Sequence, residues 1–215
     1  MIPWHQLSAD AALERLATSR DGLADAEAHG RLLKHGQNVL DEGRRRTPVG
    51  MLFGRFTDFM IIVLLAAAII SGLIGDLEDT IAIVTIVVLN AIVGFVQEYR
   101  AERAMEALKA MAAATATVVR DRTTRVIPGA EVVPGDVVLL EAGGIVPADL
   151  RLIEAARLKI DEAALTGESV PVEKAAAALA EEALPLGDRR NVAHKGTTVT
   201  YGRGSRVVFA TGMAT

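Results

Sequence analysis

Two uncharged apolar runs place the strongest constraint on how this chain folds. Residues 59–75 read FMIIVLLAAAIISGLIG, and residues 80–97 read TIAIVTIVVLNAIVGFVQ. Each run approaches the ~20 residues that an α-helix needs to cross ~30 Å of hydrocarbon, and the first reaches that length if it begins near Phe56. Two adjacent runs of this kind are difficult to bury within a chain of 215 residues. They predict membrane-spanning helices over residues 56–75 and 80–98.

The charges around these runs predict the orientation of the hairpin. The linker at 76–79 reads DLED, whereas the outer flanks are basic. Because cytoplasmic loops of membrane proteins carry an excess of Lys and Arg, both flanks are expected in the cytoplasm and the acidic linker on the opposite side. The chain is therefore expected to be integral to a plasma or inner membrane, with a cytoplasmic N-terminus. The basic residues are Arg44, Arg45, Arg46, Arg55, Arg100, Arg103 and Lys109.

The second run continues into a series of strong helix formers. Residues 97–114 read QEYRAERAMEALKAMAAA and contain neither Gly nor Pro. One helix from about residue 80 to about residue 112 is predicted, about 50 Å long at ~1.5 Å per residue. Its part at 99–114 would be a cytoplasmic stalk that carries motion between a cytoplasmic domain and the membrane. An ordinary surface helix is the alternative.

Composition excludes several classes of function. The net charge is −4 and the chain contains no Cys, so neither a general attraction to nucleic acid nor a thiolate metal site is expected. The four His show no metal-ligand spacing and are expected at the surface or at helix ends. The one candidate on an ion path is Asp58, at the cytoplasmic edge of the first run. An acid at this depth either marks an ion pathway or is simply solvated.

The first fifty residues predict a small cytoplasmic segment of helices, assigned to residues 1–50. One helix is expected over residues 8–20, with Ser8 as its N-cap. A second is expected over residues 25–35, ended by Gly36.

After the stalk the pattern changes to short runs of alternating residues, punctuated by Gly and Pro. Residues 115–215 therefore predict a compact, mostly antiparallel β domain, either a barrel or a sandwich. The Ala-rich segment 174–188 is expected to leave the sheet as a flexible or helical excursion. The final segment, 195–212, is expected to form two strands joined by a turn near Gly202 and Gly204. The earlier strands are expected within 115–121, 123–129, 135–143, 148–155 and 157–165.

One segment of this domain has the composition of a reactive loop. Residues 161–174 read DEAALTGESVPVEK, and Thr166, Gly167, Glu168 and Ser169 form its centre, here called the TGES segment. A carboxylate beside a Gly and two hydroxyls is either a solvated turn residue or a group that performs chemistry. The sequence contains no Walker A motif, nucleophile elbow or HExxH motif that would supply a catalytic site of its own.

Several segments resemble the P-type cation-transporting ATPases of type II, the branch of calcium and sodium pumps. Residues 136–155, 160–174 and 195–215 are similar to the actuator domain of that family, and residues 90–111 resemble its second membrane helix and stalk. Residues 4–8 and 22–40 resemble its N-terminal segment. The resemblance covers nearly the whole chain and implies an α+β membrane protein.

The resemblance implies a role for the TGES segment. These pumps phosphorylate an Asp and then hydrolyse the aspartyl phosphate, and the Glu of the actuator, here Glu168, positions and activates the attacking water. Gly167 would let the backbone approach the phosphate, and Thr166 and Ser169 would position the loop. Rotation of the actuator would gate the ion path through the stalk. A complete pump would require ATP and Mg²⁺, whereas this chain is expected to bind no cofactor of its own.

The chain also departs from the family pattern. The DKTGT phosphorylation motif, a nucleotide-binding domain and later membrane helices are absent from the sequence. A fragment or truncated product of a pump is therefore expected, inactive alone, with the lipid bilayer, the missing domains and a transported cation as partners. Thr57-Asp58 stands where calcium pumps often carry Glu-Asp, which leaves calcium as cargo open. The alternative is a non-catalytic membrane adaptor or a remnant of such a pump.

Overall fold

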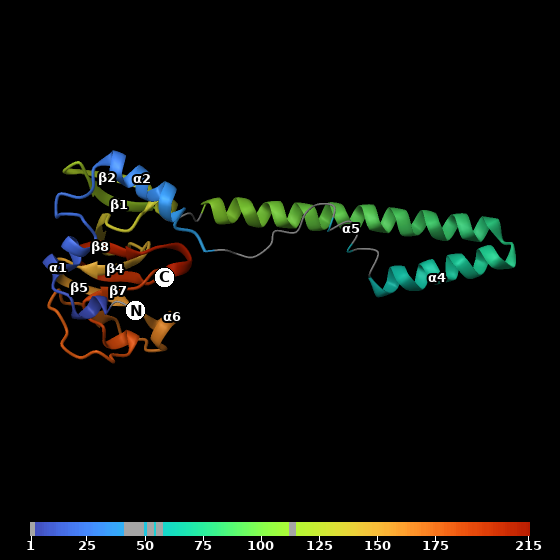
Figure 1. Ribbon diagram of the computed structural model, residues 1–215. Coiled ribbons are helices and arrows are strands. Elements are labelled where there is room, and N and C mark those ends of the chain that lie inside the picture. The colour runs from blue at the N-terminus through green and yellow to red at the C-terminus, as the bar shows by residue number, and fades with distance from the viewer. Residues whose placement is uncertain (1–2, 41–49, 51–53, 55–57, 112–114) are drawn as a thin grey trace. The chain divides into compact units, whose positions relative to one another are not determined.

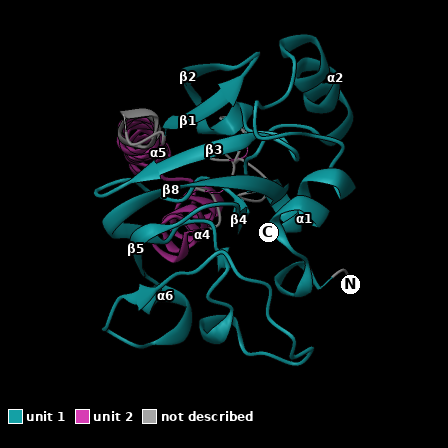
Figure 2. Cartoon of the chain, turned by 90° about the vertical axis from the view of Figure 1, so that its left-hand side faces the viewer, with its two compact units in different colours: residues 1–41, 113–215 teal, residues 42–112 magenta. Residues whose placement is uncertain are grey.

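The computed structural model describes residues 3–40, 50, 54, 58–111 and 115–215, and only the backbone of residues 106–111. The chain divides into two units, coloured separately in Figure 2. Unit 1 comprises residues 1–41 and 113–215, and unit 2 comprises residues 42–112.

Unit 2 contains two consecutive helices, α4 (Phe59–Ile74) and α5 (Leu77–Met111), joined by a tight turn. Helix α4 begins at Phe59 rather than near Phe56, because Asp58 is extended and its carboxylate caps the helix by accepting from the Met60 N–H at 3.0 Å. Gly75 ends α4 in the left-handed conformation. The connection is therefore shorter than the predicted linker at 76–79, since most of that linker already belongs to α5.

The prediction of one continuous helix from about residue 80 to about residue 112 is confirmed by α5. Helix α5 has 35 residues, which corresponds to about 52 Å at ~1.5 Å per residue. Its backbone continues to Met111, and the last residues of the predicted stalk, 112–114, lie outside the described residues.

Most apolar side chains of α4 and α5 are exposed. Leu73 is 83% exposed and Ile74 is 79% exposed, as expected for helices that need a surrounding apolar medium or further helices. The segment Leu77–Met105 is long and apolar enough to cross a membrane, since it contains an 18-residue stretch with a mean hydropathy of 2.2. Helix α4, with 16 residues, is shorter than the ~20 residues of a typical span. The prediction of two membrane spans stays a prediction.

Unit 1 is built around an antiparallel sheet, as predicted. Its hydrogen-bonded order is β2-β1-β3-β8-β4-β7, with β5 paired to β8 and β6 paired to β5. In the described residues the strands form one continuous sheet. A sandwich would have two separate sheets, and a barrel would have a closed circuit of paired strands, so the observed pairing matches neither expectation. The strands are β1 (Thr115–Arg120), β2 (Thr123–Pro128), β3 (Val137–Glu141), β4 (Asp149–Leu152), β5 (Ala156–Asp161), β6 (Val172–Glu173), β7 (Val192–Ala193) and β8 (Thr198–Ala210).

Besides two smaller clusters, one of which joins Ala12 and Leu13 to Val137, Ile153 and Val207, unit 1 has one main hydrophobic core. It consists of small aliphatic side chains, which explains how a domain almost without aromatic residues is packed. The members are Ala116, Val118, Val132, Val138, Leu140, Val146, Ala148, Leu150, Leu152, Leu158, Ile160, Ala193, Val199 and Val208.

Strand β8 corrects the expected hairpin near Gly202 and Gly204. These glycines lie inside one strand of 13 residues, which pairs with β3 on one edge and with β4 and β5 on the other. A Cβ on Gly204 would lie 2.2 Å from the Glu154 carbonyl oxygen, and one on Gly202 would lie 2.3 Å from the Arg157 carbonyl oxygen. The glycines therefore permit a close backbone approach rather than a turn.

Gly204→Ala is expected to destabilise unit 1 by about 2 kcal/mol or more, since the Glu154 carbonyl is backbone and yields only if the sheet shifts. Gly30→Ala, in an exposed helical position with nothing within 4 Å of the added Cβ, is the control and should stabilise by about 0.5–1 kcal/mol. Thermal unfolding of the detergent-solubilised chain measures both. Equal melting temperatures for Gly204→Ala and the parent chain would contradict this account of β8.

The N-terminal segment packs against the sheet through α1 (Ala9–Arg15) and α2 (Asp25–His35) (Figure 1). Ser8 caps α1 as predicted, and α2 has the predicted bounds. Helix α1 ends at Arg15 rather than residue 20, because Ala17 adopts a positive φ of 48° and turns the chain. Helix α2 lies beside the β1–β2 end of the sheet, where the Asp25 N–H donates to the Asp121 carboxylate at 3.1 Å.

The Ala-rich segment 174–188 does not form the predicted helix, and it is hydrogen-bonded to the N-terminal segment. Its only described helical turn is the short 3-10 turn η3 (Leu186–Asp188). The remainder packs against η1 (Trp4–Gln6) at the N-terminus: the Leu179 N–H donates to the His5 carbonyl at 2.9 Å. The segment 174–188 leaves the sheet as predicted but not as a helix, because hydrogen bonds to a distant segment replace those of a helix. The other short turns are η2 (Gly129–Glu131) and η4 (Gly212–Ala214).

Asn38 ties three loops of unit 1 together. Its buried amide donates to the carbonyls of Gly129 at 3.0 Å and Pro147 at 2.7 Å. Its side-chain oxygen accepts from the Gly212 N–H and from Lys195 Nζ, both at 2.9 Å. This satisfied network fixes the end of the N-terminal segment on the β domain.

Candidate functional site

The TGES segment lies at the tip of the connection between β5 and β6. Its first residue ends α6 (Ala163–Thr166), a single helical turn, and Gly167 follows in the left-handed conformation with φ 77°. The strand predicted within 157–165 is therefore wrong beyond Asp161, because the Asp161 carboxylate accepts from the Ala163 N–H at 2.9 Å and starts the turn. In Figure 1, α6 stands at one end of the sheet.

Backbone and hydroxyl groups fix the shape of this turn. The Glu162 carbonyl accepts from the Leu165 N–H at 2.9 Å, from the Thr166 N–H at 3.0 Å and from the Thr166 hydroxyl at 3.1 Å. The same hydroxyl accepts from the Glu168 N–H at 3.2 Å, and the Gly167 N–H donates to the Ala163 carbonyl at 2.8 Å. Thr166 and Gly167 thus set the path of the chain into Glu168.

Glu168 and Ser169 project from this turn into solvent. Both are exposed, and no described residue pairs with the Glu168 carboxylate. The neighbouring apolar side chains are also unburied, with Leu165 47% and Val170 75% exposed. A free carboxylate flanked by exposed apolar groups is suited to act on a group that another surface presents, since a carboxylate accepts a proton from water within hydrogen-bond reach.

A buried ion pair lies directly behind the turn. Glu162 Oε1 is 2.6 Å from Lys174 Nζ, and the two side chains are 1% and 0% exposed. Desolvation lowers the pKa of Lys174, against the opposing effect of the Glu162 carboxylate. Neither residue was predicted as a site residue, although both lie within DEAALTGESVPVEK. Their positions at the two ends of that segment were the available signal.

Asp58 belongs to unit 2 and serves there as the N-cap of α4. Within the part of the chain that the structure describes, no three His, Cys, Asp or Glu side chains are grouped to hold a metal ion. An ion-path role for Asp58 stays a prediction.

The histidine prediction holds for His29 and His35, which are exposed, and is wrong for the other two. His5 is buried with its Nε2 3.0 Å from the Glu181 carbonyl oxygen, and buried His194 lies 3.6 Å from the Asp149 carboxylate. Both are held by packing of distant segments that sequence spacing does not reveal.

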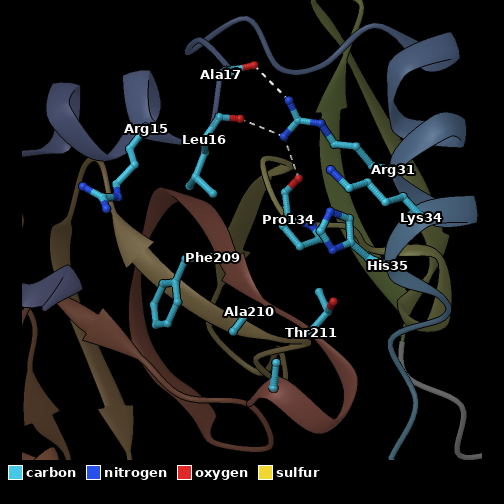
Figure 3. Close-up of a pocket in the computed structure, with 11 residues that line it drawn as sticks. Arg15, Leu16, Ala17, Arg31, Lys34, His35, Pro134, Phe209, Ala210 and Thr211 are labelled. Atoms are coloured by element: carbon cyan, nitrogen blue, oxygen red, sulfur yellow. Dashed lines mark hydrogen bonds between the residues drawn. The ribbon is translucent and has the colours of Figure 1, made fainter. Parts of the chain in front are cut away.

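A pocket of about 490 Å³ opens between α1, α2 and the end of β8 (Figure 3). Arg31 forms its wall: it donates to the carbonyls of Leu16 at 2.8 Å, Ala17 at 3.0 Å and Pro134 at 2.8 Å, and it pairs with Glu27. The donors of Arg31 are thus used within the fold, and no residue of the TGES segment lines this pocket.

Two family models match parts of the chain. Residues 110–215 match the family model of the P-type ATPase actuator domain, and residues 4–71 match that of the cation transporter/ATPase N-terminus.

Similar full-length proteins include pumps of two bacteria and a yeast. The chain is 46% identical to calcium-transporting ATPase 1 of Bacillus cereus over 99% of the chain, and 44% identical to a calcium-transporting ATPase of Bacillus subtilis over 100%. It is 41% identical to a sodium/potassium exporting P-type ATPase of Schizosaccharomyces pombe over 96% of the chain. The chain spans 24%, 24% and 20% of the lengths of these relatives.

Proposed function

Because the chain belongs to the P-type cation-transporting ATPases, of which it carries the N-terminal segment and the actuator domain, we propose that its TGES segment promotes hydrolysis of an aspartyl phosphate. The observation that carries this proposal is the position of Glu168. Its carboxylate projects from the β5–β6 tip with no partner among the described residues. It is therefore free to meet a phosphorylated Asp supplied by another part of the pump.

Glu168 acts in this proposal as a general base. The attacking water gives a proton to the carboxylate while its oxygen bonds to phosphorus. The bond from phosphorus to the Asp oxygen breaks, which yields inorganic phosphate and a free Asp. In a loose transition state, positioning the water in line with the leaving oxygen provides much of the rate enhancement.

The other residues of the TGES segment shape the approach. Gly167 lies in the left-handed conformation with nothing within 4 Å of an added Cβ, which leaves space for another backbone or a phosphate. Thr166 fixes the Glu168 N–H, and exposed Ser169 would offer its hydroxyl to the phosphate. ATP and Mg²⁺ would be used by the remainder of the pump rather than by these residues.

The membrane part of the proposal rests on unit 2. Helices α4 and α5 would span a plasma or inner membrane as a hairpin, with unit 1 in the cytoplasm. Helix α5 supports this proposal because it runs unbroken from its apolar segment to Met111, four residues before β1 begins at Thr115. Movement of the actuator would then reach the membrane through α5 and gate the path of a cation. The relatives are named for calcium and for sodium or potassium, and calcium is the first cargo to assay.

A chimera tests the proposed function. The chain replaces the matching quarter of the Bacillus cereus relative, to which it is 46% identical. The chimera is expected to form an acid-stable phosphoprotein from ATP and to lose it after a chase with unlabelled ATP. The chain alone is expected to hydrolyse no ATP above background. A folded chimera whose phosphoprotein never decays would favour the adaptor or remnant, and rapid ATP turnover by the purified chain would refute the division of roles.

A further inference from the structure

The buried ion pair behind the TGES segment has no part in the chemistry proposed above. We propose that Glu162 and Lys174 are positioning residues, whose ion pair holds the two ends of the TGES connection together and so fixes where Glu168 stands. This inference rests on the proposed function for its catalytic consequence. Its structural consequence can be measured independently.

The pair joins the two sides of the connection at its base. Glu162 lies just before α6, and Lys174 lies just after β6. Their charged groups are 2.6 Å apart and are inaccessible to solvent. Apart from Lys174, the described residues offer neither oxygen of the Glu162 carboxylate a hydrogen-bond donor. Among the described residues, the ammonium group is thus the one ion-pair partner of this carboxylate.

The backbone of Glu162 transmits that orientation to the loop. Its carbonyl accepts three hydrogen bonds from residues of α6, including the bond from the Thr166 hydroxyl at 3.1 Å. Thr166 in turn accepts from the Glu168 N–H at 3.2 Å. A continuous series of contacts therefore runs from Lys174 through Glu162 and Thr166 to Glu168.

The opposite end of the series is fixed to the sheet. The Lys174 N–H donates to the Leu158 carbonyl at 2.9 Å, which extends the β5–β6 pairing. Between the paired residues Ile160 and Val172 the connection has few other anchors. The α6 turn rests on η3, where a Cβ on Gly187 would lie 3.0 Å from the Thr166 methyl carbon.

Stability alone is a poor explanation for this pair. Taking two charges out of water costs several kcal/mol per ion, and apolar replacements are often as stable. Positive charges of Arg206 and Arg190 also act on Lys174, which makes the ammonium more costly to bury. A buried ion pair does fix the relative position of its two side chains, because the charges offset the cost of burial only when they lie in contact. A displacement of about 1 Å at a reacting group costs about 10²-fold in rate, so such positioning has catalytic value.

Hydrogen exchange of the whole 215-residue chain in detergent tests the structural consequence. The variants are Lys174→Met and the uncharged double variant Glu162→Gln/Lys174→Met, which keeps the side-chain volumes and buries no lone charge. Both are expected to speed amide exchange across residues 163–170 by tenfold or more, while exchange in β3 and β8 stays unchanged. Lys159→Met is the matched control, since Lys159 is exposed on the same hairpin. Parent-like exchange at 163–170 in the folded double variant would overturn the inference.

The catalytic consequence is measured in the chimera. The double variant should slow phosphoprotein decay by about 10- to 100-fold and leave the rate of phosphoprotein formation unchanged. The single variant Lys174→Arg, which keeps the positive charge, should decay at the parent rate. A loss of stability alone would lower the amount of phosphoprotein without changing its decay constant. If the double variant shows faster amide exchange at 163–170 but its phosphoprotein decays at the parent rate, the positioning role is overturned. If Glu168→Gln also leaves the decay constant of the phosphoprotein unchanged, the proposed function is refuted instead.

Discussion

Arg151→Met is expected to destabilise unit 1 by on the order of 4 kcal/mol, enough to abolish folding in a marginally stable domain. The Arg151 side chain is fully buried, and its donors are directed at main-chain carbonyls rather than at an acid. It thereby joins η1, the Ala-rich excursion and β4. The carbonyls belong to Trp4, Leu7, Leu152, Ala176 and Asn191.

The size of this effect follows from what the substitution leaves behind. Met fills a similar volume but donates no hydrogen bond, so several buried carbonyls lose a partner at about 1–3 kcal/mol each. Burial lowers the pKa of Arg151 to about 10, because the charged guanidinium loses its hydration. Chemical denaturation of the chain in detergent measures the loss.

Arg206→Met is the matched comparison, and its expected effect has the opposite sign. Arg206 is also fully buried, but it donates to the Gly204 carbonyl at 2.9 Å while its Nε and Nη2 lack partners among the described residues. Replacing such a charge by an apolar side chain should be neutral or stabilise by about 1–4 kcal/mol. If Arg151→Met and Arg206→Met lower the free energy of unfolding by similar amounts, this distinction is contradicted.

The pH dependence of Arg206 gives an independent check. Burial lowers the pKa of Arg206 from the usual range of an arginine to about 9, so above about pH 9 the folded state binds fewer protons than the unfolded state. Stability should therefore rise as the pH increases through about 9, and Arg206→Met should remove this rise.

The sequence predicted the elements whose signals are local. Helix α2, the cap at Ser8 and strands β1 and β2 follow from caps and alternation over a few residues. The long helix α5 follows from a continuous run of helix formers. The TGES segment was identified because its composition is unusual, and it lies at an exposed tip suited to chemistry on another surface.

The errors arose where distant segments decide the structure. A Gly-x-Gly sequence predicts a turn, yet Gly202 and Gly204 serve a close approach by residues 154–157 that no local pattern indicates. The excursion at 174–188 has helical composition, but Arg151 and Asn191 hold its carbonyls against the N-terminal segment. The partner of Glu162 was also invisible, since opposite charges twelve residues apart show no pairing until β5 and β6 come together.

Glu168→Gln is expected to have the largest effect on the proposed reaction. The substitution keeps the size of the side chain and removes its ability to accept a proton from the attacking water. General-base catalysis contributes about 10²- to 10⁴-fold, so hydrolysis of the aspartyl phosphate should slow by at least about 100-fold. Formation of the phosphoprotein from ATP should continue, because that step requires no group of the TGES segment.

The fold should be unaffected by this change. Glu168 is exposed, and its one described hydrogen bond comes from its backbone N–H. The melting temperature of the variant should equal that of the parent chain. Glu182→Gln is the control, since Glu182 is equally exposed but lies outside the TGES connection.

The most direct measurement is the decay of acid-stable phosphoprotein in the chimera after a chase with unlabelled ATP, compared among the parent, Glu168→Gln and Glu182→Gln. We expect normal formation in all three, rapid decay in the parent and in Glu182→Gln, and persistence of the phosphoprotein in Glu168→Gln. Decay of Glu168→Gln at the parent rate would contradict the assignment of Glu168 as the residue that activates water.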